Sequence, residues 1–224
     1  MALPLPLLVA TQNPDKAREI AEIFATVAHE PLESRGIEGM AFLLDTPAHI
    51  DAAVAALAVP AVAPDVEETG ATLEENARIK AAAVAEAFGV PAVADDTGLE
   101  IDELHGAPGV YSARYAGESA TYADNVAKVL RELEGVYPAD RTARFATVAM
   151  ACRPGGGEIV ARGEVEGLIA PAPRGESGFG YDPVFVPVEG DGRTFAEMRP
   201  EEKHAVSHRG RAFRALAVVL SEED

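Results

Sequence analysis

Near the N-terminus, apolar and polar residues follow a pattern that predicts a strand, a short turn and a helix. Residues 5–10, LPLLVA, form an apolar run typical of a buried strand. Asn13 belongs to the residue types favoured just before a helix, and Pro14 suits the first helical position. Apolar residues then recur at helical spacing, at Ala17, Ile20, Ala21 and Phe24.

A second helix is predicted between Thr72 and Gly89. Thr72 and Glu75 have the spacing of a capping box, in which each side chain binds the backbone of the other residue. Gly89 is the residue type most often found just past a helix end. The apolar face of this helix would comprise Ala77, Ala81, Val84, Ala85 and Phe88.

Two adjacent carboxylates, Asp95 and Asp96, follow the apolar run VPAVA of residues 90–94, which predicts a strand that ends at the pair. Alternation resumes in LEIDEL, residues 99–104, and predicts a second strand or extended segment. Neighbouring carboxylates resist joint ionisation unless a cation neutralises them. Oxygen ligands suit Mg²⁺, and Glu68 could supply another. Because Asp and Gly also favour turns, the stretch Asp-Asp-Thr-Gly has an equally weighted interpretation as a simple turn.

The second half of the chain predicts a further helix at about residues 120–134, then two strands at 142–152 and 158–169. The glycines between these strands, in PGGG, indicate a hairpin. SGFGYDPVFVP, residues 177–187, combines a loop with another strand, and a C-terminal helix begins near Ser207. Its expected apolar face is Ala212, Leu216, Val219 and Leu220.

Residues 29–66 are rich in Ala, Val and Pro and carry scattered acids. Within them IDAAVAALAV, residues 50–59, could form a helix, and three prolines interrupt the segment. We interpret the segment as peripheral structure. It could be a lid, a dimer element or an inert insertion.

Composition narrows the class of protein. The chain of 224 residues is long enough for one large or two-lobed domain, and its formal net charge of −18 disfavours nucleic-acid polymers and anionic membranes as partners. The single cysteine excludes an internal disulfide and, in practice, a cysteine-ligated zinc site. No apolar run is long enough for a membrane span, and the apolar N-terminus lacks the basic region of a signal peptide. A cytoplasmic location is therefore the default expectation.

Several cations and aromatic residues lie beside predicted turns and are candidates for contacts with a ligand. Lys16 lies in the first turn of a predicted helix, where free backbone N–H groups bind phosphate well, although the chain has no Walker A loop. Lys80 lies one helical turn after Asn76. In SGFGYD, Phe179 lies between glycines and could stack on a nucleobase. Taken singly, each of these residues has an ordinary structural explanation, as a solvated charge or a core aromatic.

Together, five sequence blocks resemble the inosine triphosphate pyrophosphatase family of the Ham1/RdgB type. The blocks occur in the family's order and span nearly the whole chain: ATQNPDKAREI at 10–20, EETGATLEENARIKA at 67–81, ADDTGLEIDELHGAPGVYSARYAG at 94–117, SGFGYDPVF at 177–185 and EEKHAVSHRGRAFRAL at 201–216. The resemblance implies a two-lobed α/β fold with a long central mixed sheet flanked by helices and a cleft between the lobes. It also implies a homodimer. The implied reaction is Mg²⁺-dependent cleavage of ITP, dITP and XTP to the nucleoside monophosphate and pyrophosphate.

The resemblance also assigns roles to residues. Asp96 matches the family's catalytic carboxylate, which is assigned as general base and metal ligand, and Asp95 and Glu68 would complete or support the metal site. Phosphate would be bound by the loop from Thr11 to Lys16, with Lys80 and Lys203 adding positive charge. Phe179 would stack on the base. The remaining predicted substrate contacts are Gln12, Asn13, Thr97, Gly180, Tyr181, Asp182, His208 and Arg209.

The chain departs from the family pattern at a few positions. Gln12 stands where the family usually has glycine and could alter the backbone of the phosphate loop, and Thr97 stands where serine is usual. Residues 29–66 are longer than the family usually has. Three rival hypotheses are a Maf-type pyrophosphatase, a nucleotide-binding module without catalysis and an acidic scaffold without a ligand.

Overall fold

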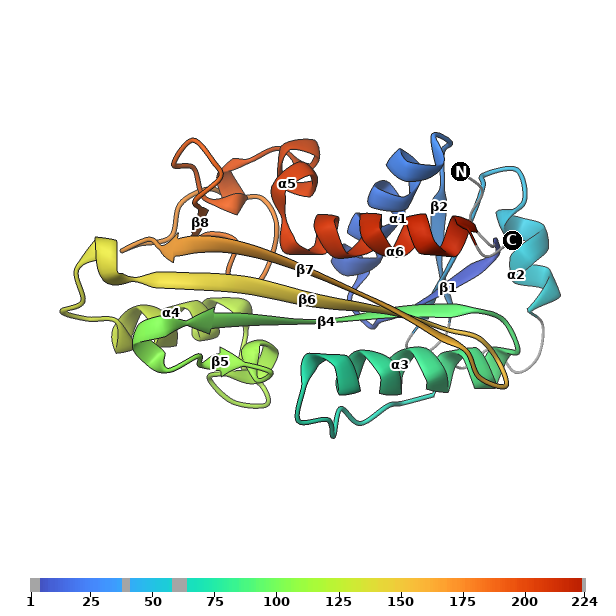
Figure 1. The fold of residues 1–224 in the computed structure, drawn as a ribbon, viewed down its shortest axis with the longest axis horizontal. Coiled ribbons are helices and arrows are strands. Elements are labelled where there is room, and N and C mark those ends of the chain that lie inside the picture. Colours follow the sequence, from blue (N-terminus) through green and yellow to red (C-terminus); the bar gives the residue numbers. More distant parts are fainter. Residues whose placement is uncertain (1–4, 38–40, 58–63, 223–224) are drawn as a thin grey trace. The chain divides into compact units, whose positions relative to one another are not determined.

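The computed structural model describes residues 5–37, 41–57 and 64–222 (Figure 1). The helices are α1 (Pro14–Ala28), α2 (Ile50–Ala56), α3 (Leu73–Phe88), α4 (Tyr122–Glu132), α5 (Pro200–Val206) and α6 (His208–Glu222). The strands are β1 (Leu7–Ala10), β2 (Glu33–Ile37), β3 (Ala41–Asp45), β4 (Ala92–Ile101), β5 (Pro108–Gly109), β6 (Thr142–Cys152), β7 (Glu158–Ile169) and β8 (Phe185–Pro187). Short 3₁₀ turns occur at Asp102–Leu104, Ser112–Arg114, Pro138–Asp140 and Phe195–Glu197.

The strands form one mixed sheet, as the family resemblance implies. Its order is β2-β3-β1-β4-β6-β7-β8, and β5 pairs with β4 outside this path. β1 pairs with β4 in parallel, with Leu8 opposite Ala92, whereas β3 pairs antiparallel with both β1 and β2. A parallel neighbour needs a crossover connection, and α1, β2, β3, α2 and α3 together lie between β1 and β4 in the sequence.

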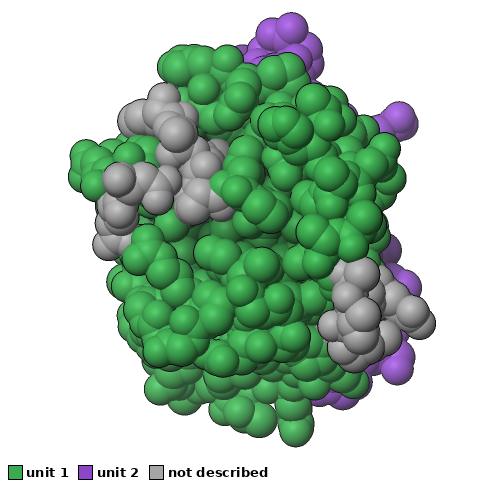
Figure 2. Space-filling model, turned by 90° about the vertical axis from the view of Figure 1, so that its right-hand side faces the viewer, with its two compact units in different colours: residues 1–96, 148–162, 212–224 green, residues 97–147, 163–211 purple. Residues whose placement is uncertain are grey.

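The chain divides into two compact units, coloured separately in Figure 2. Unit 1 comprises residues 1–96, 148–162 and 212–224, and unit 2 comprises residues 97–147 and 163–211. Strands β4, β6 and β7 contribute residues to both units. The boundary in β4 falls between Asp96 and Thr97.

In unit 1 the core lies between α1, α6 and the sheet. Ile20 and Phe24 of α1 pack with Phe213 of α6 and with Val9 and Val93 of the strands, all nearly without exposed surface. The rings of Phe24 and Phe213 meet edge to face with centroids 5.5 Å apart, a favourable aromatic geometry. α3 covers the opposite face of this part of the sheet (Figure 1).

Unit 2 has a separate aromatic core. Phe145 of β6 contacts Phe185 of β8, with ring centroids 4.6 Å apart, and Phe185 contacts Phe195 at 5.1 Å. Val126 and Val129 of α4 belong to the same cluster. The two cores keep the functional side chains of each unit on rigid elements.

Local sequence signals locate the helix ends correctly. Asn13 caps α1 by accepting hydrogen bonds from the backbone of Asp15 and Lys16, and Thr72 and Glu75 form the predicted capping box of α3. Gly89 ends α3 with φ +67°, in the left-handed region that favours glycine. These motifs depend on residues within one helical turn of each other, which is why the sequence reveals them.

Four predictions are wrong. The predicted strand end at Asp95 and Asp96 does not exist, because β4 continues to Ile101 and includes both carboxylates, so the interpretation of this stretch as a turn is also wrong. Residues 41–45 are not peripheral, because β3 pairs with β1 and buries most of its side chains. Val219 is 38% exposed and lies outside the apolar face of α6. The predicted helix at 50–59 is described only as α2 and the turn to Leu57, since residues 58–63 lie outside the described chain.

Candidate active site

The two adjacent carboxylates lie in the middle of β4, where successive side chains point to opposite faces of the sheet. Asp95 shares a face with Val93, which packs in the core against α1. Asp96 therefore points to the other face, which α3 covers. Both side chains are buried, with 2% and 7% of their residue surfaces exposed. The like charges that are adjacent in the sequence are thus separated by the strand.

Asp96 is held by two residues of α3. Lys80 Nζ lies 3.2 Å from Asp96 Oδ1, and Asn76 Nδ2 donates to Asp96 Oδ2 at 3.2 Å. The i, i+4 spacing places Asn76 and Lys80 on the same helix face. Lys80 Nζ also donates to Glu68 Oε1 at 2.9 Å. Asn76 in turn accepts from the backbone of Gly70 at 2.8 Å, so α3 and the segment before it form one network around the carboxylate.

The network has perturbed proton affinities. Burial raises the pKa of Asp96, an effect that the nearby ammonium groups of Lys80 and Lys16 only partly offset. Burial by itself would lower the pKa of Lys80, but the carboxylates of Asp96, Glu68 and Asp95 together raise it. The site therefore combines a firmly charged ammonium group with a carboxylate that holds a proton more readily than an exposed aspartate.

Asp95 pairs with the first helix. Lys16 Nζ lies 3.3 Å from Asp95 Oδ2, and Lys16 occupies the first turn of α1, where the Asn13 cap fixes the backbone. Thr11 Oγ1 accepts from the backbone N–H of Asn13 at 3.1 Å, so the loop before α1 is tied internally. The Gln12 side chain is exposed. Outside glycine, only two described residues, His29 and His105, have positive φ, so Gln12 does not force a left-handed backbone here.

In unit 2 the loop of residues 177–182 folds around the carboxylate of Asp182. The backbone N–H of Phe179 donates to Asp182 Oδ2 at 2.8 Å. A side chain at Gly178 would place its Cβ 2.1 Å from the same oxygen, and the φ of Gly178 is +73°. The loop therefore requires glycine at 178 for two physical reasons, contact and backbone angle.

Lys203 completes this arrangement. Its Nζ lies 2.7 Å from Asp182 Oδ2, in an ion pair whose side chains are 5% and 4% exposed. The same ammonium lies 5.0 Å from the centroid of the Phe179 ring. Lys203 was predicted to add charge to the phosphate site; in unit 2 its observed partners are Asp182 and the face of Phe179, because the short helix α5 directs it to this loop.

His208 and Arg209 begin α6, directly after Ser207, whose Oγ accepts from the Gly210 backbone at 3.0 Å as a helix cap does. The His208 ring stacks on Phe145, with centroids 4.4 Å apart and an interplanar angle of 19°. Arg209 places its guanidinium carbon 5.4 Å from the Phe179 centroid. Both residues are 2% exposed.

The remaining predicted contacts are backbone or hydroxyl groups. Gly180 has φ +63°, a conformation that side chains rarely adopt. Tyr181 packs in the core of unit 2, and its hydroxyl donates to the carbonyl of Ser112 at 2.9 Å, so a substrate contact here would come from its backbone. Thr97 Oγ1 accepts a hydrogen bond from Arg209 Nη2 at 3.2 Å.

Sequence reasoning missed three residues that contact the predicted site. Asn76 binds Asp96, and its only sequence signal was the spacing to Lys80. Thr147 lies 2.7 Å from the Thr97 hydroxyl but belongs to an apolar strand pattern that gives no hint of this. Tyr122 packs beside Phe179 with ring centroids 6.1 Å apart, and no local signal connects these two positions.

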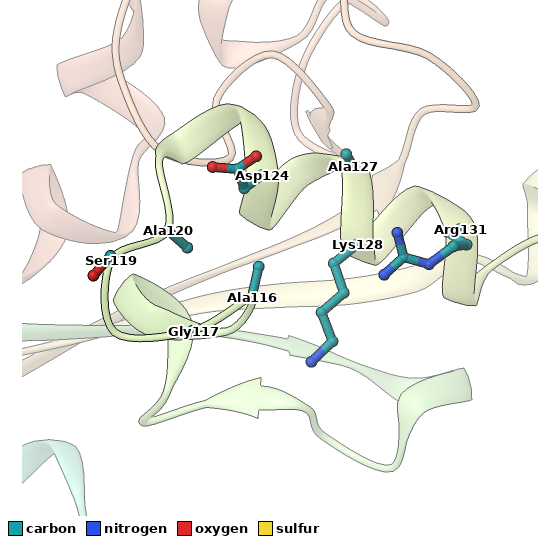
Figure 3. A pocket seen from close by; sticks show the side chains of 8 residues that line it. All are labelled: Ala116, Gly117, Ser119, Ala120, Asp124, Ala127, Lys128 and Arg131. Atoms are coloured by element: carbon teal, nitrogen blue, oxygen red, sulfur yellow. The ribbon is translucent and has the colours of Figure 1, made fainter.

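A separate pocket of about 630 Å³ lies between α4 and the loop before it (Figure 3). Its walls include Lys128 and Arg131 on one helix and Gly117 in the loop. Lys128 also lies over the ring of Tyr115, 3.9 Å from its centroid. No residue of the predicted site lines this pocket.

In the described part of the chain, no helix is both long and apolar enough to cross a membrane.

Comparison with known proteins identifies the family. A sequence model of the Ham1 family matches residues 7–219. The dITP/XTP pyrophosphatases of Geobacillus kaustophilus and Bacillus subtilis are 46% and 44% identical to the chain over 210 and 213 residues, covering 94% and 95% of it and 91% and 96% of those proteins. The solved structure of the Staphylococcus aureus Ham1 protein matches with a TM-score of 0.72 at 35% identity, covering 97% of this chain and 98% of that one. The resemblance predicted from the five sequence blocks is confirmed, and the chain belongs to the Ham1 family.

Proposed function

We propose that the protein hydrolyses non-canonical purine nucleoside triphosphates, ITP, dITP and XTP, to the nucleoside monophosphate and pyrophosphate. The observation that carries this proposal is the buried pair Asp95 and Asp96, each paired with a lysine from a different helix. Lysine ammonium groups beside carboxylates suit a substrate that brings both phosphate and a cation. Relatives that match nearly the whole chain are named dITP/XTP pyrophosphatases.

In the proposed reaction, a water oxygen attacks the α-phosphorus while the bond from that phosphorus to the bridging oxygen breaks. Pyrophosphate leaves with the bridging oxygen, and Asp96 takes a proton from the water as general base. The raised pKa of Asp96 favours this role, because a base works best when its pKa approaches the working pH. Lys16 and Lys80 would stabilise the negative charge of the phosphates, which grows on the leaving group.

We also propose Mg²⁺ as the cofactor, held by oxygens of Glu68 and Asp96, whereas Asp95, on the opposite face of β4, would support the site through its pairing with Lys16 rather than share the ion. The chemistry of these donors fits the ion, because Glu68 and Asp96 already converge on one cationic group, the Lys80 ammonium. Within the described residues, no group of three or more His, Cys, Asp or Glu side chains is arranged to hold a metal. Mg²⁺ commonly takes only one or two carboxylates and fills its other positions with substrate phosphates and water. When bound, it would neutralise phosphate charge.

Base selection would reside in unit 2. Phe179 offers a ring face for stacking, and stacking alone does not distinguish purines. Arg209 and His208 lie at the same helix start and can donate hydrogen bonds. ITP and XTP carry an oxygen acceptor at position 6, where ATP has an amino donor. A buried donor that faces an amino group stays unpaired, and this penalty rejects the wrong base more strongly than a lost contact would.

Pyrophosphate release from ITP, XTP, dITP, ATP and GTP, measured with Mg²⁺ and with EDTA, tests the proposal. Asp96→Asn should abolish release while leaving the fold intact. Asp51→Asn is the matched control, because Asp51 is 87% exposed in a surface ion pair. Release that survives Asp96→Asn would remove this residue from the mechanism. Tight nucleotide binding without release would favour a binding module, and strong release from ATP or GTP instead of ITP would favour a Maf-type activity on other nucleotides.

We further propose that the protein acts as a homodimer in the cytoplasm. The support for the homodimer is the family resemblance, and a nucleotide pool is the setting in which such a substrate occurs. Sedimentation equilibrium on the purified chain measures the assembly state. A monomer at micromolar concentration would contradict the dimer and leave the proposed chemistry standing.

A further inference from the structure

The side chains of Thr147, Thr97 and Arg209 form a hydrogen-bonded row within unit 2. Thr147 Oγ1 lies 2.7 Å from Thr97 Oγ1, and Arg209 Nη2 donates to Thr97 Oγ1 at 3.2 Å. Thr147 has no exposed surface, and Arg209 is 2% exposed. The two outer side chains are therefore shielded from water and depend on their protein partners, while Thr97 between them is half-buried.

The direction of these hydrogen bonds follows from the chemistry of the groups. A guanidinium can only donate, so Thr97 Oγ1 must accept from Arg209. The hydroxyl of Thr97 has one hydrogen and two lone pairs. Whether it donates to Thr147 or accepts from it, the contact to Thr147 leaves a lone pair of Thr97 for Arg209. The contact to Thr147 is thus compatible with the hydrogen bond from Arg209 in either direction.

The backbone makes this spacing rigid. Thr97 lies on β4 and Thr147 on β6, which are neighbouring strands of the sheet. The threonine side chain is β-branched and therefore stiff about its first torsion angle. Both hydroxyls are consequently held in place by the sheet. The Arg209 guanidinium, which donates to one of them, is thereby held in place as well.

We propose that Thr147 is a positioning residue for base selection: through Thr97 it orients the Arg209 guanidinium toward the edge of a 6-oxo purine. The inference rests on the proposed function. A guanidinium held in one orientation cannot avoid an amino group at position 6, so it stays unpaired against ATP. A loosened guanidinium can turn away and escape this penalty. Loss of the Thr147 hydroxyl should therefore reduce discrimination more than it reduces catalysis.

Thr147→Val removes the hydroxyl and keeps the shape of the side chain, whereas Thr147→Ser keeps the hydroxyl. Thr142→Val is the matched control on the same strand, because the Thr142 hydroxyl donates to Asp102 Oδ2 at 2.6 Å on the surface. The measurements are kcat and KM for ITP and for ATP, by pyrophosphate release. We expect Thr147→Val to lower the ratio of kcat/KM for ITP over ATP about 5-fold, the size expected for one hydrogen bond. Thr147→Ser and Thr142→Val should retain the wild-type ratio.

If Thr147→Val keeps the wild-type ratio of kcat/KM for ITP over ATP, the inference is overturned. If its melting temperature is lower while that ratio is unchanged, the hydroxyl has a purely structural role. A reduced ratio in Thr147→Ser would also overturn it, because the methyl group would then be the important part. If Thr147→Val does not fold, Thr147→Ala replaces it and is compared with Thr147→Ser, because these two variants differ only by the hydroxyl. Wild-type protein that releases no pyrophosphate from ITP would refute the proposed function itself, an outcome distinct from every result with the variants.

Discussion

The buried ion pair between Lys203 and Asp182 gives a sharp test of the energetics of the base site. Lys203→Met keeps much of the side-chain volume and removes the charge. Both partners are at least 95% buried, with 5% and 4% of the side chains exposed, so the variant leaves the Asp182 carboxylate without its cation in a dry site. Breaking such a pair costs about 3–5 kcal/mol, a large part of the roughly 5–15 kcal/mol that stabilises a typical domain. We expect a loss of free energy of unfolding in this range.

A control and a second variant separate burial from charge deletion in general. Arg18→Met removes the cation of an exposed pair, in which Arg18 and Asp15 are 65% and 40% exposed, and should cost about 0–1 kcal/mol. Adding Asp182→Asn to Lys203→Met should recover part of the stability, because the neutral amide oxygen can still accept from the Phe179 backbone.

The assay is urea unfolding followed by far-UV circular dichroism, since the chain has no tryptophan. A cost below about 1 kcal/mol for Lys203→Met would refute the argument that burial makes this pair important. A double variant that is less stable than Lys203→Met alone would show that the uncompensated charge is not the cause of the loss.

Three further predictions concern aromatic residues and the thiol. Tyr122→Ala should raise KM for ITP about 2- to 10-fold with little change in kcat, because Phe179 loses an aromatic neighbour. Tyr122→Phe is the control and should behave as wild type. An unchanged KM in Tyr122→Ala would contradict the prediction. Burial raises the pKa of the Cys152 thiol to about 11. This thiol should therefore react slowly with Ellman's reagent at pH 8 in the native protein and react fully after unfolding. Fast reaction of Cys152 in the native protein would refute its burial. Burial and a hydrogen bond to Glu132 raise the pKa of Tyr115 to about 12. The contribution of Tyr115 to the free energy of unfolding should therefore be complete below about pH 10 and be lost as the pH rises through 12. A pH titration followed by tyrosinate absorbance, in which every tyrosine ionises near pH 10, would contradict this prediction.

The sequence predicts helix positions well where the signal is local. The Asn13 cap and the Thr72–Glu75 box involve residues within three positions of each other, and both form as expected. The same holds for the PGGG hairpin between β6 and β7. Strand β3 was missed, because residues 41–45 owe their strand conformation to pairing with β1, a partner more than thirty positions earlier in the sequence.

For the candidate site, the sequence determined the residue types and their order, and thereby the family. It indicated an acid pair, a lysine in the first turn of a helix and an aromatic residue between glycines. It could not show that Asp95 and Asp96 point to opposite faces of one continuous strand, because that depends on how β4 is paired along its whole length.

Only the tertiary structure decided which charged and polar groups become partners. Lys80 meets Asp96 across 16 positions of sequence, Lys203 meets Asp182 across 21, and Thr97 meets Thr147 across 50. These contacts form because burial in the two cores brings helices and strands together, and buried polar groups then need partners wherever they lie in the chain. Local sequence patterns predict helix caps and turns, because these form between neighbouring residues. The partners in the site are set by packing between distant segments, which the pattern of neighbouring residues does not specify.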